Sequence, residues 1–529
     1  MMECCQLYSA LLFLLLLTLP SCQGGKILVF PVDGSHWVNM NILLRELHSR
    51  GHEITVLRYS NSWYIKEQAT HYTSLTIPVP DASLEGQDIF TGFLSRMLDI
   101  QMRDRSPLAF LTIHKESNAF LSKIHRLSSQ TVVTIFEDPE IMKKLQGFDV
   151  VLTDPTMAVG LLIAHRLKLP VVLNVRWTSS GEGHFAIAPS PLSYVPMAGT
   201  RFSDRMTFTQ RLLNVLIYGL NFYADRFVIS TPYDDLCARY CDSGTDIRTL
   251  LQSADIWLMR LDFVFEFPRP TMPNVIYIGG FQCQPSKPLT PELEEFMESS
   301  GKHGVIVMSL GTLVESLPRE VTAKIALAFA QLPQKIIWRY IGERPQNLGN
   351  NTLLVKWLPQ NDLLGHPKTR AFVAHGGTNG IYEAIYHGVP VVGLPLLFDQ
   401  FDNLLRLEVR GAAKVLDFAT MSSVEYLQAL KQVLEEPSYR RNMKRLSILH
   451  HDQPMEPMHS ALFWIEYVMR NGGAAHLRTE AYRMPWYSYH SLDVIAVLLA
   501  ALVVFLITGI GVFRFLCCRV CKSRKTKQE

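Results

Sequence analysis

Cysteine is scarce in the middle of this 529-residue chain. Of nine cysteines, three precede residue 25 and three follow residue 516, which leaves Cys237, Cys241 and Cys283 in between. Three cysteines without metal-ligand spacing exclude both a disulfide-stapled scaffold and a structural zinc site. At most one disulfide bridge is compatible with this number, and the sequence does not decide its pairing.

An excess of charge of one sign is also lacking. The chain has 51 Lys and Arg against 48 Asp and Glu, a formal net charge of +3, which excludes the concentrated basic face of a nucleic-acid-binding protein. Hydrophobic residues make up 48% and charged residues 19%, a composition that excludes a disordered chain. Six basic residues and one acidic residue follow Phe513, so the positive charge is concentrated at the C-terminus.

Two common nucleotide-binding patterns are missing. No G-x-G-x-x-G follows the first apolar strand, so a standard dinucleotide site is not expected. No D-x-D triplet occurs either, and such a carboxylate pair is the usual metal clamp on a nucleotide-sugar diphosphate. We therefore expect any diphosphate to be bound by backbone amides, a helix dipole and side chains, with no cofactor and no obligatory metal.

Long apolar runs are present near both ends of the chain. Residues 7–20 are too few to span a bilayer comfortably and lie where a secretory signal peptide would, so residues 1–24 are predicted to be one. An uncleaved anchor is the alternative, because this region has Glu3 and no basic residue. Residues 494–513 carry no charge and match a transmembrane helix that follows an aromatic belt.

The basic tail, residues 514–529, is predicted to be cytosolic, which makes the chain a single-pass type I membrane protein with a lumenal body. Lys525 and Lys527 resemble the dilysine signal of endoplasmic reticulum membrane proteins, and a plain positive-inside anchor is the alternative. Asn350 heads the only N-x-S/T sequon and is a candidate glycosylation site in a lumenal body.

Short apolar strands alternate with helix-length stretches along the body, a pattern typical of parallel sheets covered on both faces. A first series comprises Lys26–Phe30, Glu53–Leu57, Phe148–Thr153 and Pro170–Val175. A second comprises Asn274–Gly279, Gly304–Leu310, Lys335–Arg339, Thr352–Val355, Ala371–Ala374 and Pro390–Leu394. We predict an α/β protein with two facing Rossmann-like domains, residues 25–285 and 286–450, followed by helices and a membrane-proximal segment at 451–493.

A glycine-rich turn lies between the predicted strand Ala371–Ala374 and a helix expected from Ile381. It reads His375-Gly376-Gly377-Thr378-Asn379-Gly380. Glycines there allow close approach of a ligand, and free N–H groups at a helix start favour a phosphate. The turn is therefore a candidate phosphate cradle, and a plain glycine-rich turn is the alternative.

The block from Trp357 to Gly411 resembles the signature of the UDP-glucuronosyltransferases, the animal membrane branch of the inverting UDP-sugar glycosyltransferases. DGSHW at 33–37, FDVVLTD at 148–154, AIAPSPLSYVP at 186–196 and FWIEYVMR at 463–470 support this resemblance, which covers essentially the whole chain. It implies a GT-B architecture, with the acceptor on the N-terminal domain and the UDP-sugar on the C-terminal domain.

The resemblance also implies roles for individual residues. Trp357 should stack on the uracil, Gln360 should contact the base through its backbone, and Glu383 should accept hydrogen bonds from the ribose. Asp399 and Gln400 should bind the sugar hydroxyls. Ser309, His375, Thr378 and Asn379 should hold the diphosphate, and Arg339 matches an arginine that lies near the nucleotide in the same strand of the family. Gly377 and Gly380 complete the predicted UDP-sugar site. Core packing is the alternative for Trp357, and a structural ion pair is the alternative for Arg339.

A candidate catalytic base precedes this block. Sugar transfer to a hydroxyl needs a base, and histidine titrates near neutral pH. His36 follows the first strand in the turn Asp33-Gly34-Ser35, and Asp154 ends another strand at the same sheet edge. A carboxylate on the second ring nitrogen would fix the imidazole tautomer. The pair resembles the family's His–Asp dyad, and a surface histidine is the alternative.

The acceptor pocket is expected between residues 55–130 and 180–225, where apolar side chains are frequent. Examples are Phe90, Phe93, Met97, Phe110, Phe120, Phe222 and Tyr223, for which core packing or a membrane-contacting helix is the alternative. The predicted reaction transfers glucuronate from UDP-glucuronate to a small lipophilic acceptor, giving the β-glucuronide. UDP-glucose, UDP-galactose or UDP-N-acetylglucosamine as donor, and a non-catalytic lipophile-binding protein, are the alternatives. Membrane lipid is an expected partner, and homo- or hetero-oligomer formation is left open.

Overall fold

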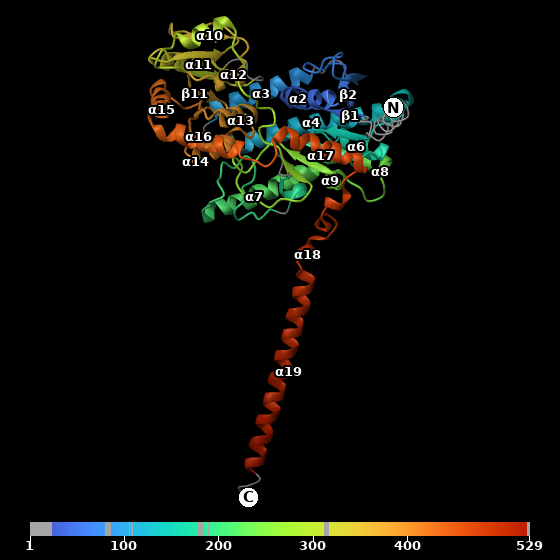
Figure 1. The fold of residues 1–529 in the computed structure, drawn as a ribbon. Helices are drawn as coiled ribbons and strands as arrows, with labels where there is room; N and C mark the ends of the chain where they lie inside the picture. Colours follow the sequence, from blue (N-terminus) through green and yellow to red (C-terminus); the bar gives the residue numbers. More distant parts are fainter. Residues whose placement is uncertain are drawn as a thin grey trace, which may run out of the picture. The chain divides into compact units, whose positions relative to one another are not determined.

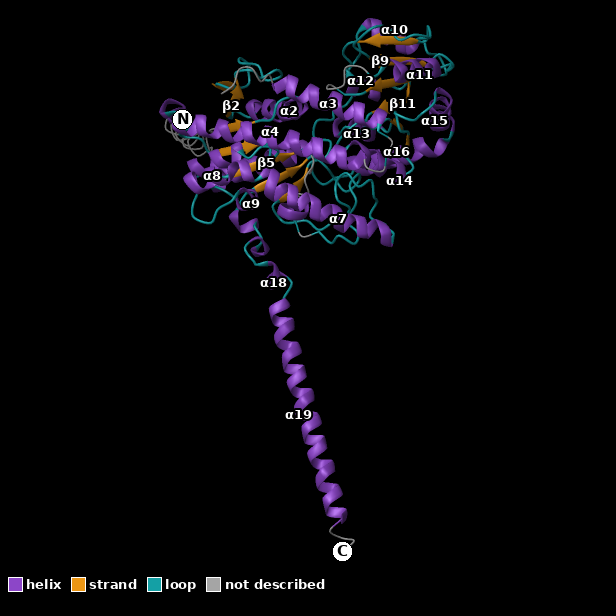
Figure 2. Ribbon diagram, turned by 180° about the vertical axis from the view of Figure 1, so that it is seen from behind, coloured by secondary structure: helices purple, strands orange, loops and turns teal. Residues whose placement is uncertain are grey.

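The computed structural model describes residues 24–79, 86–104, 106, 109–176, 183–188, 190–311 and 317–525, so nearly all of the predicted signal peptide lies outside the described residues. Two compact units divide the chain, the first ending at Leu477 and the second beginning at Arg478. The first unit contains two parallel β-sheets, each flanked by helices (Figure 2). The prediction of two Rossmann-like α/β domains is confirmed.

The first sheet has seven parallel strands in the order β3-β2-β1-β4-β5-β6-β7. They are β1 (Lys26–Phe30), β2 (Glu53–Tyr59), β3 (Thr73–Ile77), β4 (Val150–Thr153), β5 (Val171–Val175), β6 (Ile256–Met259) and β7 (Val275–Tyr277). The central strands are buried almost throughout, because helices cover both faces of the sheet. Apolar, often β-branched side chains therefore point to both faces of these strands.

Helices pack on both faces of this sheet (Figure 1). On one face, α2 (Ser35–Ser49) and α17 (Pro457–Asn471) pack against alternate strand residues such as Val29 and Val56. On the other, α6 (Val159–Leu167) packs against the opposite set, such as Leu28 and Val151. The further helices of this lobe are α3 (Gly86–Arg103), α4 (Ala109–Glu137), α5 (Pro139–Lys144), α7 (Phe208–Ala224), α8 (Thr231–Tyr240), α9 (Ile247–Gln252) and the π-helices η1 (Gly183–Ile187) and η2 (Asp225–Ile229).

The second sheet has six parallel strands in the order β10-β9-β8-β11-β12-β13. They are β8 (Val305–Ser309), β9 (Lys335–Arg339), β10 (Thr352–Val355), β11 (Thr369–Ala374), β12 (Val391–Gly393) and β13 (Ala413–Val415). Its helices are α10 (Pro291–Glu298), α11 (Arg319–Phe329), α12 (Gln360–Gly365), α13 (Thr378–His387), α14 (Gln400–Val409), α15 (Ser423–Glu435) and α16 (Pro437–His451). α11 and α15 cover one face, and α12, α13 and α16 pack with the core on the other.

Three details differ from the sequence predictions. The segment Asn274–Gly279 does not begin the second series, since its strand β7 pairs with β6 in the first sheet. The helix expected from Ile381 begins three residues earlier, at Thr378, because the carbonyl of Gly377 already accepts the first helical hydrogen bond, from the backbone N–H of Ile381. His36 lies in the first turn of α2 and not in the turn before it.

The structure also shows the surroundings of the candidate glycosylation site and of the three central cysteines. Asn350 is exposed in a turn just before β10. Cys237, Cys241 and Cys283 are free thiols. The first two lie one helical turn apart at the end of α8.

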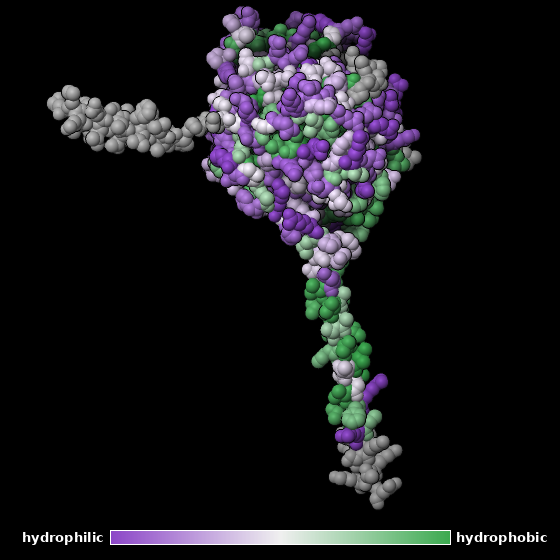
Figure 3. All heavy atoms as spheres, turned by 90° about the vertical axis from the view of Figure 1, so that its right-hand side faces the viewer, coloured by the Kyte–Doolittle hydropathy of each residue, from purple (hydrophilic) through white to green (hydrophobic). Residues whose placement is uncertain are grey.

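The second unit is helical. It contains the short η4 (Glu480–Tyr482) and α18 (Trp486–Tyr489), followed by α19 (Leu492–Lys525). The most apolar 18-residue stretch within residues 492–519 of α19 has a mean hydropathy of 2.9, and the predicted span 494–513 lies within residues 492–519. Hydrophobic side chains surround much of α19 (Figure 3). A helix of this composition and length is long enough to cross a bilayer.

Candidate active site

A cavity of about 840 Å³ lies between the two sheets of the first unit. Its walls come from segments that follow the carboxyl ends of parallel strands in both lobes, where α/β proteins bind ligands. The first lobe contributes residues 30–36 after β1 together with parts of α3 and α4. The second lobe contributes residues 309–311, 357–362 and 397–400 and the start of α13. The cavity therefore brings the predicted base and the predicted donor site together.

His36 and Asp154 are in direct contact at this cavity. The His36 Nδ1 atom lies 2.6 Å from Asp154 Oδ2, and the backbone N–H of Thr156 donates to Asp154 Oδ1 at 3.0 Å. Burial alone would raise the pKa of Asp154, but His36 and the hydrogen bonds from Thr156 lower it to about 2. Burial lowers the pKa of His36, although Asp154 opposes this. At neutral pH the carboxylate is therefore ionised and the imidazole neutral, with Nδ1–H bound to Asp154 and Nε2 left to accept a proton.

A compact turn holds His36 in place. Gly34 adopts a φ of 75°, which suits glycine, and α2 begins directly after it. Asp33 accepts hydrogen bonds from the backbone N–H groups of Gly34, Trp63 and Tyr64 at 2.8, 3.1 and 3.0 Å. These bonds fix the loop after β1 to the loop after β2. The sequence showed Asp33 only as a turn residue, so its anchoring role was missed.

The predicted phosphate cradle lies at the start of α13. Gly377 is the N-cap and no side chain caps the helix, so the first backbone N–H groups are available to an anion. His375 is packed between two glycines, since a Cβ added at Gly311 or Gly377 would lie 2.8 or 2.5 Å from its ring. Burial, followed by Arg176, lowers the pKa of His375 to about 4, so the ring is neutral. The buried atoms His375 Nδ1 and Thr378 Oγ1 have no hydrogen-bond partner within the described part of the chain, which suits a polar ligand.

Asn379 has a partner that the sequence did not reveal. Its side-chain amide exchanges two hydrogen bonds with Asn39 of α2, at 2.9 and 2.6 Å. These bonds join the two lobes beside the cavity. The structure thus places the Asn379 side chain in a contact between lobes, while its backbone remains at the helix start. Its role at the diphosphate stays a prediction.

The predicted nucleotide residues lie along one side of the cavity. Trp357 lines it and is 66% exposed, so core packing is not its role. Gln360 Nε2 donates to the carboxylate of Glu383, and burial raises the pKa of Glu383 to about 7. Arg339 donates to the carbonyl of Gly311 and holds the loop that follows Ser309.

The predicted sugar-binding residues lie at the start of α14. Asp399 Oδ2 accepts a hydrogen bond from Asn403 Nδ2 at 2.7 Å. Gln400 Oε1 accepts from the backbone N–H groups of Leu396 and Leu397 at 2.8 and 3.0 Å. The Gln400 oxygen therefore shapes the loop after β12. Both side chains line the cavity, and their contact with a sugar stays a prediction.

Only part of the predicted acceptor pocket lies on this cavity. Phe90, Phe93 and Phe120 line it, and the rings of Phe93 and Phe120 stack with centroids 4.0 Å apart. Met97 is buried in the core, and the Phe110 side chain lies outside the described part. The prediction was wrong for two residues of α7: Phe222 and Tyr223 are 40% and 56% exposed on the surface of that helix.

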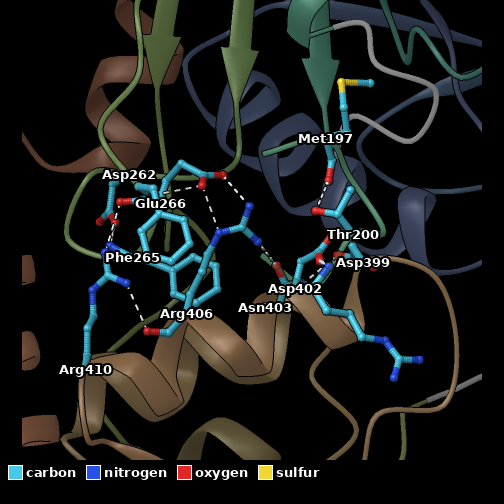
Figure 4. Close-up of polar contacts among 12 residues, drawn as sticks. Met197, Thr200, Asp262, Phe265, Glu266, Asp399, Asp402, Asn403, Arg406 and Arg410 are labelled. Atoms are coloured by element: carbon cyan, nitrogen blue, oxygen red, sulfur yellow. Dashed lines mark hydrogen bonds and ion pairs between the residues drawn. The ribbon is translucent and has the colours of Figure 1, made fainter. Parts of the chain in front are cut away.

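A buried network of charges connects the lobes near the start of α14 (Figure 4). Arg406 donates to both carboxylate oxygens of Glu266, at 2.8 and 3.0 Å, and to Asn403 Oδ1 at 3.0 Å. Asp402 accepts from the backbone N–H groups of Gly199 and Arg201 at 2.6 and 3.0 Å. Because Asn403 also holds Asp399, this network fixes the predicted sugar-binding segment relative to the first sheet.

Comparison with known proteins identifies the family. A family profile described as "UDP-glucoronosyl and UDP-glucosyl transferase" matches residues 25–528. The chain belongs to this family. It is 42% identical over 511 residues to UDP-glucuronosyltransferase 2A2 of Mus musculus, covering 96% of each chain. It is 44% identical over 518 residues to UDP-glucuronosyltransferase 2B1 of Rattus norvegicus, again covering 96% of each.

Solved structures support the fold of this glycosyltransferase. The calicheamicin glycosyltransferase CalG4 matches with a TM-score of 0.54 at 18% identity, covering 84% of this chain and 99% of its own. The spinosyn forosaminyltransferase SpnP matches with a TM-score of 0.53 at 18% identity, with the same coverage. The GT-B architecture and the activity class, transfer of a sugar by an enzyme, follow from the fold and the family together.

Proposed function

We propose that this glycosyltransferase transfers glucuronate from UDP-glucuronate to a hydroxyl group, or another nucleophile, of a small lipophilic acceptor. The observation that carries the proposal is the His36–Asp154 contact at a cavity whose opposite wall is the α13 start. The aromatic residues of α3 and α4 on the same cavity suit an apolar acceptor. Relatives named UDP-glucuronosyltransferases favour glucuronate as the transferred sugar.

The proposed mechanism moves one proton and one sugar. The acceptor O–H proton passes to His36 Nε2 while the oxygen attacks C1 of the sugar and the bond from C1 to the phosphate oxygen breaks. The ionised Asp154 stabilises the imidazolium that forms. The N–H groups at the start of α13 stabilise the departing UDP, so no obligatory metal is required. Attack from the face opposite UDP gives the β-glucuronide.

The proposed role of His36 as the general base can be tested by mutation. His36→Ala and Asp154→Asn are expected to lower kcat/KM by at least about a hundredfold, because general-base catalysis is lost. UDP binding is expected to persist, since His36 lies in the other lobe from the cradle. Initial rates with UDP-glucuronate and a phenol panel, together with UDP calorimetry, measure both effects. In the unmodified enzyme the rate should fall only below the ordinary histidine pKa, since burial lowers the pKa of His36.

A second His–Asp pair provides the control. His450 Nδ1 lies 2.8 Å from Asp262 Oδ2, but neither residue lines the cavity. His450→Gln is expected to lower the unfolding temperature and to leave kcat per folded molecule unchanged. Normal turnover by His36→Ala, or equal losses in both variants, would contradict the assignment of His36.

We also propose that the enzyme is a single-pass type I protein of the endoplasmic reticulum membrane, with its catalytic body in the lumen. The apolar α19 supports the span, and the basic tail with Lys525 and Lys527 supports the orientation and the compartment.

A further inference from the structure

One face of α4 forms a long wall of the cavity. The residues of α4 that line it recur three or four positions apart from Ser117 to Thr131, which is the spacing of a single helix face and covers about 21 Å of helix. The middle of this face is apolar, with Phe120, Leu121 and Ile124. The cavity is therefore long enough for an acceptor that extends well beyond its reacting hydroxyl group.

The same wall becomes polar over the following turns of α4. His125, Ser128 and Thr131 line the cavity there and are only 4%, 4% and 2% exposed. Ser128 Oγ donates to Met157 Sδ at 3.1 Å, and Thr131 Oγ1 donates to the Leu127 carbonyl at 3.0 Å. Polar groups buried this deeply are normally hydrogen-bonded, and these two hydroxyl groups have partners within the chain.

His125 is bonded through one ring nitrogen only. Its Nδ1 atom lies 3.0 Å from the hydroxyl oxygen of Tyr233, a fully buried residue of α8. Burial raises the pKa of Tyr233 and lowers the pKa of His125 to about 4, so both side chains are neutral. A phenol is the stronger donor and an imidazole nitrogen the stronger acceptor, so Tyr233 donates to Nδ1 and the ring proton lies on Nε2. This Nε2–H group has no hydrogen-bond partner in the described part of the chain.

The unpartnered donor shares its cavity with the catalytic pair. His125 and His36 both line it. Ser128, about one helical turn from His125, contacts Met157, which comes three positions after Asp154. An acceptor whose hydroxyl group reaches Nε2 of His36 can therefore extend along α4 to His125.

We propose that the Nε2–H group of His125, held in place by Tyr233, donates a hydrogen bond to a carbonyl oxygen of the acceptor, remote from the hydroxyl group that receives the sugar. The inference rests on the proposed function in one respect, namely that this cavity binds a lipophilic acceptor. It selects phenols that also carry a ketone, because an acceptor without one leaves a buried N–H group unpaired. Tyr233 is a positioning residue, since it acts through the ring of His125.

Pairs of phenols that differ in one group test this selection. Hydroxy-β-tetralone and hydroxytetralin differ by a carbonyl in place of a methylene group, and estrone and its deoxy analogue differ in the same way over a longer distance. Neither carbonyl is conjugated with the phenol, so the reacting hydroxyl group is alike within a pair. The full-length enzyme in membranes is assayed with UDP-glucuronate, and kcat/KM for the ketone is divided by kcat/KM for its methylene partner. We expect this ratio to be about ten or more in at least one pair.

His125→Phe keeps a ring in place and removes the donor, so the ketone ratio should fall by about tenfold, to near equality. His125→Gln, whose amide N–H can replace Nε2–H, should retain part of the preference. Tyr233→Phe should lower the ratio by a smaller factor, because Nδ1 loses the hydroxyl group that holds it. The double variant of His125→Phe and Tyr233→Phe leaves no unpaired hydroxyl group in the core and should show the same low ratio as His125→Phe.

His184 and Tyr426 provide matched controls. Burial also lowers the pKa of His184 to about 4, and its Nε2 atom lies 3.4 Å from the Val195 carbonyl oxygen, but His184 does not line the cavity. Tyr426 is a fully buried phenol in α15 of the other lobe. His184→Phe and Tyr426→Phe can change the unfolding temperature, but they should leave the ketone ratio of the unmodified enzyme intact.

Three results would overturn the inference. Equal kcat/KM for both members of every pair in the unmodified enzyme would show that the His125 N–H group does not select the acceptor. A ketone preference that survives in His125→Phe and in the double variant would place the selection elsewhere. A preference for estradiol over estrone that His125→Phe abolishes would show that Nε2 accepts a proton donor instead. If the unmodified enzyme transfers glucuronate to none of these phenols, the proposed function itself fails and the inference falls with it.

Discussion

At the scale of single residues, Glu383 shows how burial adjusts a ligand-binding group. It lies in α13 beside the cavity, and Gln360 donates a hydrogen bond to its carboxylate. Burial raises its pKa to about 7, although Gln360 opposes the rise. Hydrogen bonds from ribose hydroxyls require the ionised form as acceptor. The proposed contact with the ribose is therefore sensitive to pH near neutrality.

This sensitivity gives a prediction for UDP binding. As pH falls below about 7, the carboxyl group of Glu383 is protonated, so the Kd of UDP should rise by up to about tenfold per pH unit. Glu383→Gln should weaken binding at about pH 8 and remove this part of the pH dependence. Calorimetric titration at several pH values measures both. The pH dependence of the UDP Kd that remains in Glu383→Gln reports the titration of UDP itself.

Glu425→Gln is the control, since this exposed residue caps α15 through Ser422 and lies away from the cavity. It should leave the Kd of UDP unchanged at every pH. The ribose role of Glu383 is wrong if its replacement by glutamine leaves the pH profile of the unmodified enzyme intact.

The sequence predicted site residues well where they follow the carboxyl ends of parallel strands. His36 and Asp154 are 118 positions apart, and their contact follows from two strand ends at one edge of a sheet. The Asn39–Asn379 contact could not be predicted in this way, because it depends on how two lobes dock. A charged residue directly after a buried strand, as at Arg176 and Arg260, was a usable signal, but only the structure shows that the Arg260 guanidinium has no hydrogen-bond partner in the described part of the chain.

At the scale of elements, α7 presents an unusual surface. Within residues 208–229, which comprise α7 and η2, the most apolar 18-residue stretch has a mean hydropathy of 1.2, yet only 11% of that stretch is buried. Its exposed apolar side chains include Phe208, Leu212, Val215, Leu216 and Tyr223. The sequence placed parts of this segment in the acceptor pocket, because an apolar run does not by itself show whether it faces a cavity, a core or the outside. Its exposure favours contact with a membrane surface.

A chain that ends at Leu477 tests this contact, since the first unit is compact by itself. It is expected to float with phospholipid vesicles although α19 is absent. Leu212→Glu combined with Leu216→Glu should release most of it, because two charges would enter the apolar face. Val424→Glu is the control, as Val424 is equally exposed on α15 of the other lobe. If the charges introduced on α7 do not reduce flotation, the proposed contact of α7 with the membrane is wrong.

At the scale of the whole molecule, the lobes are joined by the network around Arg406. Removing one partner of a buried ion pair leaves an uncompensated charge, so Arg406→Ala should cost about 3–5 kcal/mol of unfolding free energy. Burial raises the pKa of Asp402, and Arg406 opposes the rise. Without Arg406 that pKa rises further. A carboxyl group whose pKa is higher in the folded than in the unfolded state stabilises the fold at low pH, and this contribution is lost as pH rises through the folded-state pKa. The free energy of unfolding of the variant should therefore be lower at about pH 7.5 than at about pH 5.

Chemical denaturation at both pH values measures this cost. The exposed pair Arg319–Glu343, with its atoms 2.7 Å apart, is the control, and Arg319→Ala should cost less than about 1 kcal/mol. Replacing Arg406 and Glu266 together by leucine should recover much of the loss. Equal costs for Arg406→Ala and Arg319→Ala would show that the network does not hold the lobes.

The two-lobed architecture was predictable because buried parallel strands read as short apolar runs. The strands β3 and β13 were not predicted, since their runs carry polar residues, and β6 was missed although its four residues are apolar. The assignment of β7 also failed, because periodicity shows a strand and not the sheet that it joins.

The position of α17 has a consequence for synthesis of the chain. Its residues Ala461, Leu462, Ile465 and Val468 complete the core on one face of the first sheet, against strands that leave the ribosome hundreds of residues earlier. Domains usually fold in order as they emerge. Here the N-terminal lobe cannot close its core until the C-terminal lobe has been made, so the lobe that starts first is finished last.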